Sequence, residues 1–183
     1  FNTRIVYMCG FVIAIGNFSE TEVKAATRSI SYRGPDDTNF FFNESSKVKI
    51  GFNRLSIIDI EGGRQPFKSE NENYVIAYNG EIYNTNILRK ELESHSVKFK
   101  TKNSDTEVFL KGYEFWGAKI FEKIDGMFAV AIIDFNKNKL IIARDKFGEK
   151  PIYFSKQKEG LIIGSELKIF KQFRNFNINY DYF

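Results

Sequence analysis

Short runs of apolar residues, bounded by glycine, asparagine and serine, recur along most of the chain. Such runs are typical of β-strands that are buried in a sheet. The predicted strands cover residues 9–16, 38–42, 47–52, 74–78, 127–133, 140–143, 152–154 and 161–163. Sheets are therefore expected to form the centre of the molecule.

Capping patterns indicate helices between these strands. Residues 19–22 and 104–107 each place a serine three residues before a glutamate, which is the capping box that opens a helix. Together with the spacing of apolar positions, these patterns predict helices over residues 19–31, 84–94, 104–116 and 165–171.

The run 127–133 decides the expected architecture, because it is apolar at odd and even positions alike. A strand of this kind is buried on both faces. A turn at 136–138 joins it to the strand 140–143 as an antiparallel hairpin, although antiparallel sheets usually expose one face to water. A doubly buried hairpin needs a layer on each side. The chain is therefore predicted to be an α+β protein, a four-layer αββα sandwich of two antiparallel sheets.

The composition excludes several classes of site. One cysteine, Cys9, and one histidine, His95, cannot supply a disulfide framework or a zinc site built from thiolates and imidazoles. The net charge is +4 over 183 residues, but the lysines are scattered among acids, which favours a solvated surface over a nucleic-acid face. No metal and no nucleic-acid partner are expected.

Nothing in the chain predicts a membrane span or a secretion signal. The longest apolar runs are far short of the roughly 20 residues that cross a bilayer. The residues before Met8 are too few and too polar for a signal peptide. The cytoplasm is therefore the expected compartment, with no membrane partner.

Cys9 has two interpretations, a small buried hydrophobe or a nucleophile. It follows Met8, and a methionine before a small residue is typical of an initiator that is removed. Cys9 would then carry a free α-amine, whose pKa near 8 lets it act as a base at neutral pH. A histidine base is not needed, and His95 is expected at the exposed end of a helix.

Polar residues near strand and helix ends could bind the charged groups and the amide of a substrate. Asn79, Gly80 and Glu81 offer a side-chain amide, an unobstructed N–H and a carboxylate, although Asn-Gly is also a strong turn signal. Arg54 could clamp a carboxylate or lie on the surface. Asp105 could bind an ammonium group or serve only the dipole of its helix.

Taken together in chain order, these segments resemble the glutaminase domain of glutamine-hydrolysing asparagine synthetase. That domain is a class II glutamine amidotransferase with the N-terminal-nucleophile hydrolase fold. The matching pieces lie at residues 8–10, 33–37, 54–59, 79–84, 104–107, 125–129, 144–145, 148–151 and 165–168. No single piece is specific, but the ordered set is, and it covers nearly everything from Met8 to Lys171.

The resemblance implies that Cys9 attacks the side-chain amide of L-glutamine and forms a glutamyl thioester, which releases glutamate and ammonia. Asn79 and the Gly80 N–H would form the oxyanion hole, and Glu81 and Asp105 would hold the substrate ammonium group. Arg54 would hold the substrate α-carboxylate. The implied glutamine-binding stretch also includes Leu55, Ser56, Ile57 and Ile58.

The chain departs from the family pattern in three places. Tyr32 stands where the family commonly has histidine. Residues 1–8 precede the nucleophile and are expected to be an extraneous or removed leader. The amidotransferase domain is expected to cover residues 9–183 and to end before its last strand, without the ATP-dependent synthetase domain. The domain itself would need no cofactor, whereas ATP and Mg would belong to the missing domain.

The resemblance also indicates what the full-length enzyme does with the ammonia. It would convert aspartate to asparagine, so the synthetase domain of the same chain is an expected partner, and a homodimer remains open. Two alternatives are a non-catalytic binding or regulatory module on the same fold, and the amidotransferase domain of a relative that amidates another acceptor.

Overall fold

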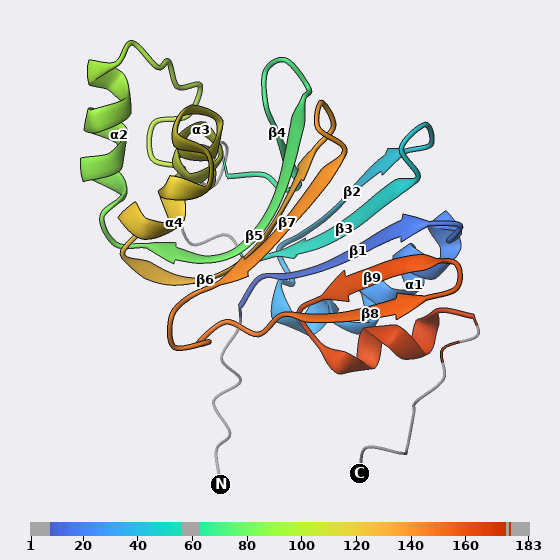
Figure 1. Ribbon diagram of the computed structural model, residues 1–183. Coiled ribbons are helices and arrows are strands. Elements are labelled where there is room, and N and C mark those ends of the chain that lie inside the picture. Colours follow the sequence, from blue (N-terminus) through green and yellow to red (C-terminus); the bar gives the residue numbers. More distant parts are fainter. Residues whose placement is uncertain (1–7, 56–62, 175, 177–183) are drawn as a thin grey trace, which may run out of the picture.

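The computed structural model describes residues 8–55, 63–174 and 176, and in them two antiparallel sheets are stacked between two helical layers (Figure 1). The first sheet has the strand order β2-β3-β1-β9-β8. Its strands are β1 (Gly10–Gly16), β2 (Asp37–Asn43), β3 (Val48–Arg54), β8 (Tyr153–Gln157) and β9 (Gly160–Gly164).

The second sheet has the order β4-β5-β6-β7 in the described part of the chain. Its strands are β4 (Phe67–Lys68), β5 (Tyr74–Ile82), β6 (Gly126–Asp134) and β7 (Lys139–Arg144). The helices are α1 (Glu20–Ser29), α2 (Thr85–Ser94), α3 (Asp105–Trp116) and α4 (Ile120–Lys123), with 3₁₀ turns at Ser31–Arg33, Gly117–Lys119 and Leu167–Gln172. None of these described helices is long and apolar enough to cross a membrane.

The layers explain why β6 is buried on both faces. Phe128, Val130 and Ile132 pack against the layer of α2, α3 and α4, whereas Ala131 and Ile133 face the other sheet. A third cluster fills the space between the first sheet, α1 and the 3₁₀ helix Leu167–Gln172. The predicted αββα sandwich is confirmed.

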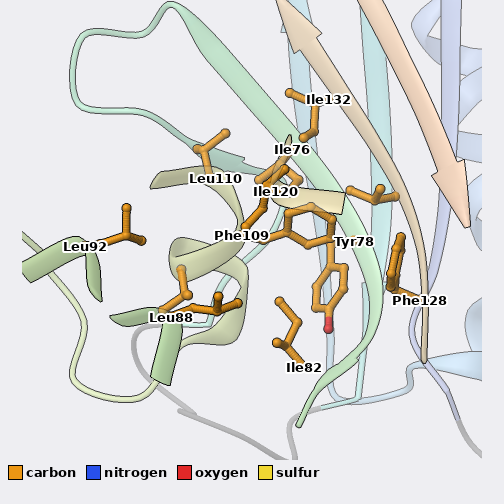
Figure 2. Packing of buried hydrophobic residues seen from close by; sticks show 12 residues of the cluster. Ile76, Tyr78, Ile82, Leu88, Leu92, Phe109, Leu110, Ile120, Phe128 and Ile132 are labelled. Carbon is orange, nitrogen blue, oxygen red and sulfur yellow. The ribbon is translucent and has the colours of Figure 1, made fainter. Parts of the chain in front are cut away.

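Aromatic rings join β5 to α3 on the helical side of the second sheet (Figure 2). Phe109 of α3 meets Tyr78 of β5 edge to face, with ring centroids 5.5 Å apart, and meets Phe128 of β6 in the same way at 5.4 Å. Such edge-to-face pairs stabilise by about 0.5–1.5 kcal/mol beyond the area they bury. The start of α3 is therefore held firmly beside the middle of β5.

Most predicted elements are confirmed, with small corrections. Ser19 and Glu22 form the complete capping box. The second box is only half formed, because the Glu107 carboxylate accepts from the N–H groups of Lys100 and Thr101 instead of capping Ser104. The last predicted helix is a 3₁₀ helix, Leu167–Gln172, and the patterns missed β4 and α4.

Candidate active site

A pocket of about 250 Å³ opens at the ends of β3 and β5 and beside the start of α3. Seven of the predicted site residues line it, which are Cys9, Arg54, Leu55, Asn79, Gly80, Glu81 and Asp105. The other three, Ser56, Ile57 and Ile58, lie outside the described residues. The fold thus gathers residues from four separate stretches of sequence into one cavity.

Cys9 lies directly before β1, at the wall of this pocket. Its Sγ is 3.4 Å from the Leu55 nitrogen, whose N–H donates to it, and 3.7 Å from the Leu55 carbonyl oxygen. Burial raises the pKa of the Cys9 thiol, and the Leu55 N–H and the Arg54 charge offset this only in part. The thiol therefore keeps its proton at neutral pH, and a nucleophilic role requires a base.

The main chain at Cys9 is held by a buried arginine. Arg33 Nε donates to the Cys9 carbonyl oxygen at 3.1 Å, and Arg33 Nη1 pairs with Glu166 at 3.0 Å. The Tyr32 hydroxyl donates to the same Glu166 carboxylate, and the Lys168 ammonium lies 3.9 Å from the centre of the Tyr32 ring. Tyr32, the residue that departs from the family pattern, thus supports the group that holds Arg33.

Asn79 lies within β5, so the interpretation of Asn-Gly as a turn is wrong. Its side chain emerges on the face between the two sheets, because Val75 and Ala77, four and two residues earlier, belong to the core between them. Asn79 is 2% exposed, and its Nδ2 has no hydrogen-bond partner among the described residues. Leaving a buried donor unpaired costs about 1–3 kcal/mol, so this amide is available to a group that enters the pocket.

The Gly80 N–H is open to the same pocket. In β6, Phe128 is the residue that lies opposite Gly80. The Phe128 N–H donates to the Asp145 carboxylate and the Phe128 carbonyl oxygen accepts from the Asp145 N–H, so both groups point away from β5. Because main-chain groups alternate in direction along an antiparallel strand, the polar groups of Gly80 point away from β6. In the described part of the chain, β4 pairs only with the first half of β5, so no described strand covers this edge at Gly80. A Cβ here would lie 2.2 Å from the Met127 carbonyl oxygen, so the close approach of β6 requires glycine.

Asp105, the first residue of α3, also lines the pocket and lies beside this edge of β5. Its Oδ2 accepts from the Tyr78 hydroxyl at 2.9 Å. Burial raises the pKa of Asp105, although the Tyr78 hydroxyl and the Ile82 N–H oppose the shift. Burial and the Asp105 charge hold the pKa of Tyr78 well above its ordinary value, so the phenol keeps its proton and donates.

Arg54 ends β3 and is only 4% exposed, so its interpretation as a surface residue is wrong. The Asp36 N–H donates to the Arg54 carbonyl oxygen at 3.1 Å, which fixes the end of the strand. Glu81 is exposed at the rim of the pocket. The pocket is thus lined by a buried cation, a buried carboxylate and a second, exposed acid.

The sequence patterns missed some of the pocket wall. Gln65, Tyr78, Thr106 and Met127 line it, and none of them stands out in the sequence as a polar residue at the end of a strand. Lys150 also lines it, and its Nζ is 3.2 Å from Met8 Sδ. His95 is exposed at the end of α2, as expected, and packs against the Phe115 ring instead of the pocket. The described residues hold no group of three or more His, Cys, Asp or Glu side chains that could bind a metal ion.

Comparison with known proteins gives these residues a context. The profile of one family, described as the glutamine amidotransferase domain, matches residues 8–182. Glutamine-hydrolyzing asparagine synthetase 2 of Bacillus subtilis is 45% identical over 146 residues, which are 80% of this chain and 19% of that protein. Asparagine synthetase 1 of the same organism is 42% identical over 168 residues, 88% of this chain and 26% of that protein. The chain thus spans about a fifth to a quarter of these relatives.

Solved structures share the fold. Glutamine phosphoribosylpyrophosphate amidotransferase from B. subtilis, complexed with ADP and GMP, superimposes with a TM-score of 0.74 at 21% identity, over 89% of this chain and 43% of that one. This likeness confirms the expected amidotransferase type of αββα sandwich. The chain therefore belongs to the glutamine amidotransferase domain family, as a glutaminase domain of the type that glutamine-hydrolysing asparagine synthetases carry.

Proposed function

We propose that the chain hydrolyses L-glutamine to glutamate and ammonia through a thioester on Cys9. The observation that carries this proposal is a pair of donors on the same pocket as the thiol, Asn79 Nδ2, which has no partner among the described residues, and the Gly80 N–H, which points away from β6. Donors placed in this way stabilise the oxyanion of a tetrahedral intermediate, and each contributes roughly 3 kcal/mol to lowering the barrier.

The first half of the reaction forms the thioester. With Met8 removed, the α-amine of Cys9 takes the thiol proton, and the sulfur attacks the amide carbon of glutamine. The oxyanion that forms accepts hydrogen bonds from Asn79 and Gly80. The intermediate then collapses, the C–N bond breaks, and the leaving nitrogen takes the proton from the α-amine to depart as ammonia.

The second half regenerates the enzyme. The α-amine takes a proton from a water molecule, whose oxygen attacks the thioester carbonyl, and the oxyanion uses the same two donors. Collapse then breaks the C–S bond, returns the proton to the thiolate and releases glutamate. The raised pKa of the buried thiol favours this return, because the neutral thiol is its resting form.

The charged walls of the pocket suit an amino acid with two opposite charges. Arg54 would hold the α-carboxylate through a bidentate contact. Asp105 and Glu81 would hold the α-ammonium group. Burial of Arg54 and Asp105 strengthens both contacts, since fewer waters compete for them. The clamp therefore selects glutamine over amides that lack these charges.

The use of the ammonia is a separate part of the proposal. By analogy with the asparagine synthetases, a synthetase domain of the same full-length protein would pass this ammonia to aspartate, with ATP and Mg bound there. The support is the identity of 42–45% to such enzymes.

Substitution of the thiol tests the hydrolysis. Cys9→Ala should abolish ammonia release while the thermal unfolding midpoint stays close to that of the parent chain. An electrophilic glutamine analogue should label Cys9 in the parent chain, and excess L-glutamine should protect it. Ammonia release by Cys9→Ala at the parent rate would overturn the proposal, and a parent chain that binds glutamine without hydrolysing it would favour a non-catalytic module.

A further inference from the structure

The side chain of Gln65 takes the place of a strand residue beside β5. The register of β4 against β5 runs Phe67 to Ile76 and Lys68 to Val75, and its continuation would put Gln65 opposite Tyr78. The main chain does not continue the ladder there, because β4 begins only at Phe67. Instead, the side-chain amide of Gln65 makes both ladder contacts. Its Oε1 accepts from the Tyr78 N–H at 2.7 Å, and its Nε2 donates to the Tyr78 carbonyl oxygen at 2.8 Å.

This substitution affects the residues that follow Tyr78. One more step of the same register would bring a main-chain partner to Gly80, and its N–H would then be occupied. Because the Gln65 side chain ends the ladder at Tyr78, the next residue whose main-chain groups point to this edge of β5, Gly80, faces the pocket. The following one, at Ile82, donates its N–H to Asp105.

Gln65 is built into the site and not merely close to it. It is 5% exposed, lines the pocket, and its Nε2 also lies 3.4 Å from the Thr106 hydroxyl oxygen at the start of α3. One amide thus joins the strand that carries Asn79 to the helix that carries Asp105. The Gln65 amide is neutral, and its hydrogen-bonding groups already contact the Tyr78 main chain and the Thr106 hydroxyl. Gln65 is therefore not expected to bind the charged ends of a substrate.

We propose that Gln65 is a positioning residue for the oxyanion hole. Its amide fixes the β5 main chain one residue before Asn79, at the last ladder position before the part of this edge that no described strand covers. The proposal rests on the proposed glutaminase function. It predicts that changes at Gln65 act through Asn79, and that they lower the rate of the chemical step more than they weaken glutamine binding.

Gln65→Glu is the sharpest variant, because it keeps the shape but replaces the Nε2 donor with an oxygen that repels the Tyr78 carbonyl oxygen. In the chain with Cys9 as its first residue, kcat should fall by about 10- to 100-fold, the loss typical of a small misplacement of a catalytic group. KM should change by less than about threefold, because the hydrogen bonds of Gln65 within the described residues are to the Tyr78 main chain and Thr106 and not to the side chains of the clamp. Gln157→Glu in β8, far from the pocket, is the matched control and should keep the parent kinetics.

A double-mutant cycle separates positioning from general damage. In an Asn79→Ala background, Gln65→Glu should lower kcat by less than about threefold, since the donor it positions is gone. Alkylation of Cys9 by iodoacetamide forms no oxyanion, so its rate should match that of the parent chain. Gln65→Met keeps the length of the side chain and loses both contacts with Tyr78. It should show the same loss of kcat and the same unchanged alkylation rate.

The proposal is overturned if Gln65→Glu keeps kcat within about threefold, if the loss is equal in both backgrounds, or if alkylation falls as much as hydrolysis. Failure of both Gln65 variants to fold would also contradict it, because Gln65 would then serve the fold as a whole. A parent chain that does not turn over glutamine would instead refute the proposed function.

Discussion

Two buried asparagines, one in each sheet, show how the same residue type can have different roles. Asn53 of β3 is fully buried, and its amide is satisfied, since Nδ2 donates to the Thr27 carbonyl oxygen at 2.7 Å and Oδ1 accepts from the Thr38 hydroxyl at 2.8 Å. Asn79 of β5 is almost as buried, yet its Nδ2 has no partner among the described residues. A satisfied buried amide stabilises a fold, whereas an unsatisfied one stores a donor for a ligand.

Removing the unsatisfied donor should give the largest effect on catalysis. Asn79→Ala should lower kcat about 10²- to 10³-fold, because one of the two oxyanion donors is lost. The free energy of unfolding should stay the same or rise, since the buried Nδ2 group has no hydrogen-bond partner among the described residues. Steady-state ammonia release and urea unfolding measure the two quantities. An Asn79→Ala variant with parent kcat would remove Asn79 from the proposed mechanism.

The satisfied asparagine should respond in the opposite way. Asn53→Ala breaks two buried hydrogen bonds and leaves the Thr27 carbonyl oxygen unpaired, so it should lower the free energy of unfolding by about 1–3 kcal/mol. Its kcat, measured well below the unfolding transition, should stay within about threefold of the parent value. Equal stability losses in the Asn53 and Asn79 variants would erase the contrast between the two residues.

A pair of tyrosines in β5 extends the comparison to substrate binding. Tyr78→Phe removes the hydroxyl that donates to Asp105, so KM for glutamine should rise about tenfold, in line with a hydrogen bond to a charged group. Tyr74→Phe, on the same face of the strand but outside the pocket, is the control and should leave KM unchanged. Similar KM values for the two variants would mean that the Tyr78 hydroxyl does not support the clamp.

Substitution of Asp105 should give the smallest effect, a change in the free energy of unfolding that depends on pH. Because burial raises its pKa, the folded chain holds this proton to a higher pH than the unfolded chain does, and ionised Asp105 lowers stability at neutral pH. Asp105→Asn should therefore stabilise the chain at pH 7, by about 0.5–2 kcal/mol. The gain should shrink as the pH falls through the raised pKa and below the ordinary carboxyl range.

Thermal unfolding of the parent chain and Asp105→Asn at several pH values measures this difference. A gain that grows toward acid pH would have the wrong sign for a raised pKa, and would mean that the folded chain favours the ionised carboxylate. Glutamine binding should weaken in the same variant, so stability and binding move in opposite directions.

The strands and the layers followed from local patterns. The doubly apolar run 127–133 predicted a strand with a layer on each side, and β6 has both. The Ser19 box predicted the start of α1 because its contacts lie within four residues. The Ser104 box was only half right, since Glu107 bonds with the loop at Lys100 and Thr101, a competition that no local pattern reveals.

The residues of the candidate site could be predicted only in part from residue chemistry and the family resemblance. Cys9, Arg54, Asn79 and Asp105 were predicted from residue type and resemblance, and the fold gathers them in one pocket. Gln65 could not be predicted, because its role depends on a strand that begins only two residues later and on a register that only the assembled sheet defines. Tyr78 was missed for a similar reason, since an aromatic residue in a buried strand indicates a core.

The free amine of Cys9 is the central claim, and one comparison tests it most directly. Ammonia release from glutamine should be measured for the chain that begins at Cys9 and for the chain that retains residues 1–8, with the intact mass of each form recorded in the same samples. We expect the form that begins at Cys9 to release ammonia and the longer form to be at least about 100-fold slower, because it lacks the base. Undiminished ammonia release by chains whose mass still includes residues 1–8 would contradict the account.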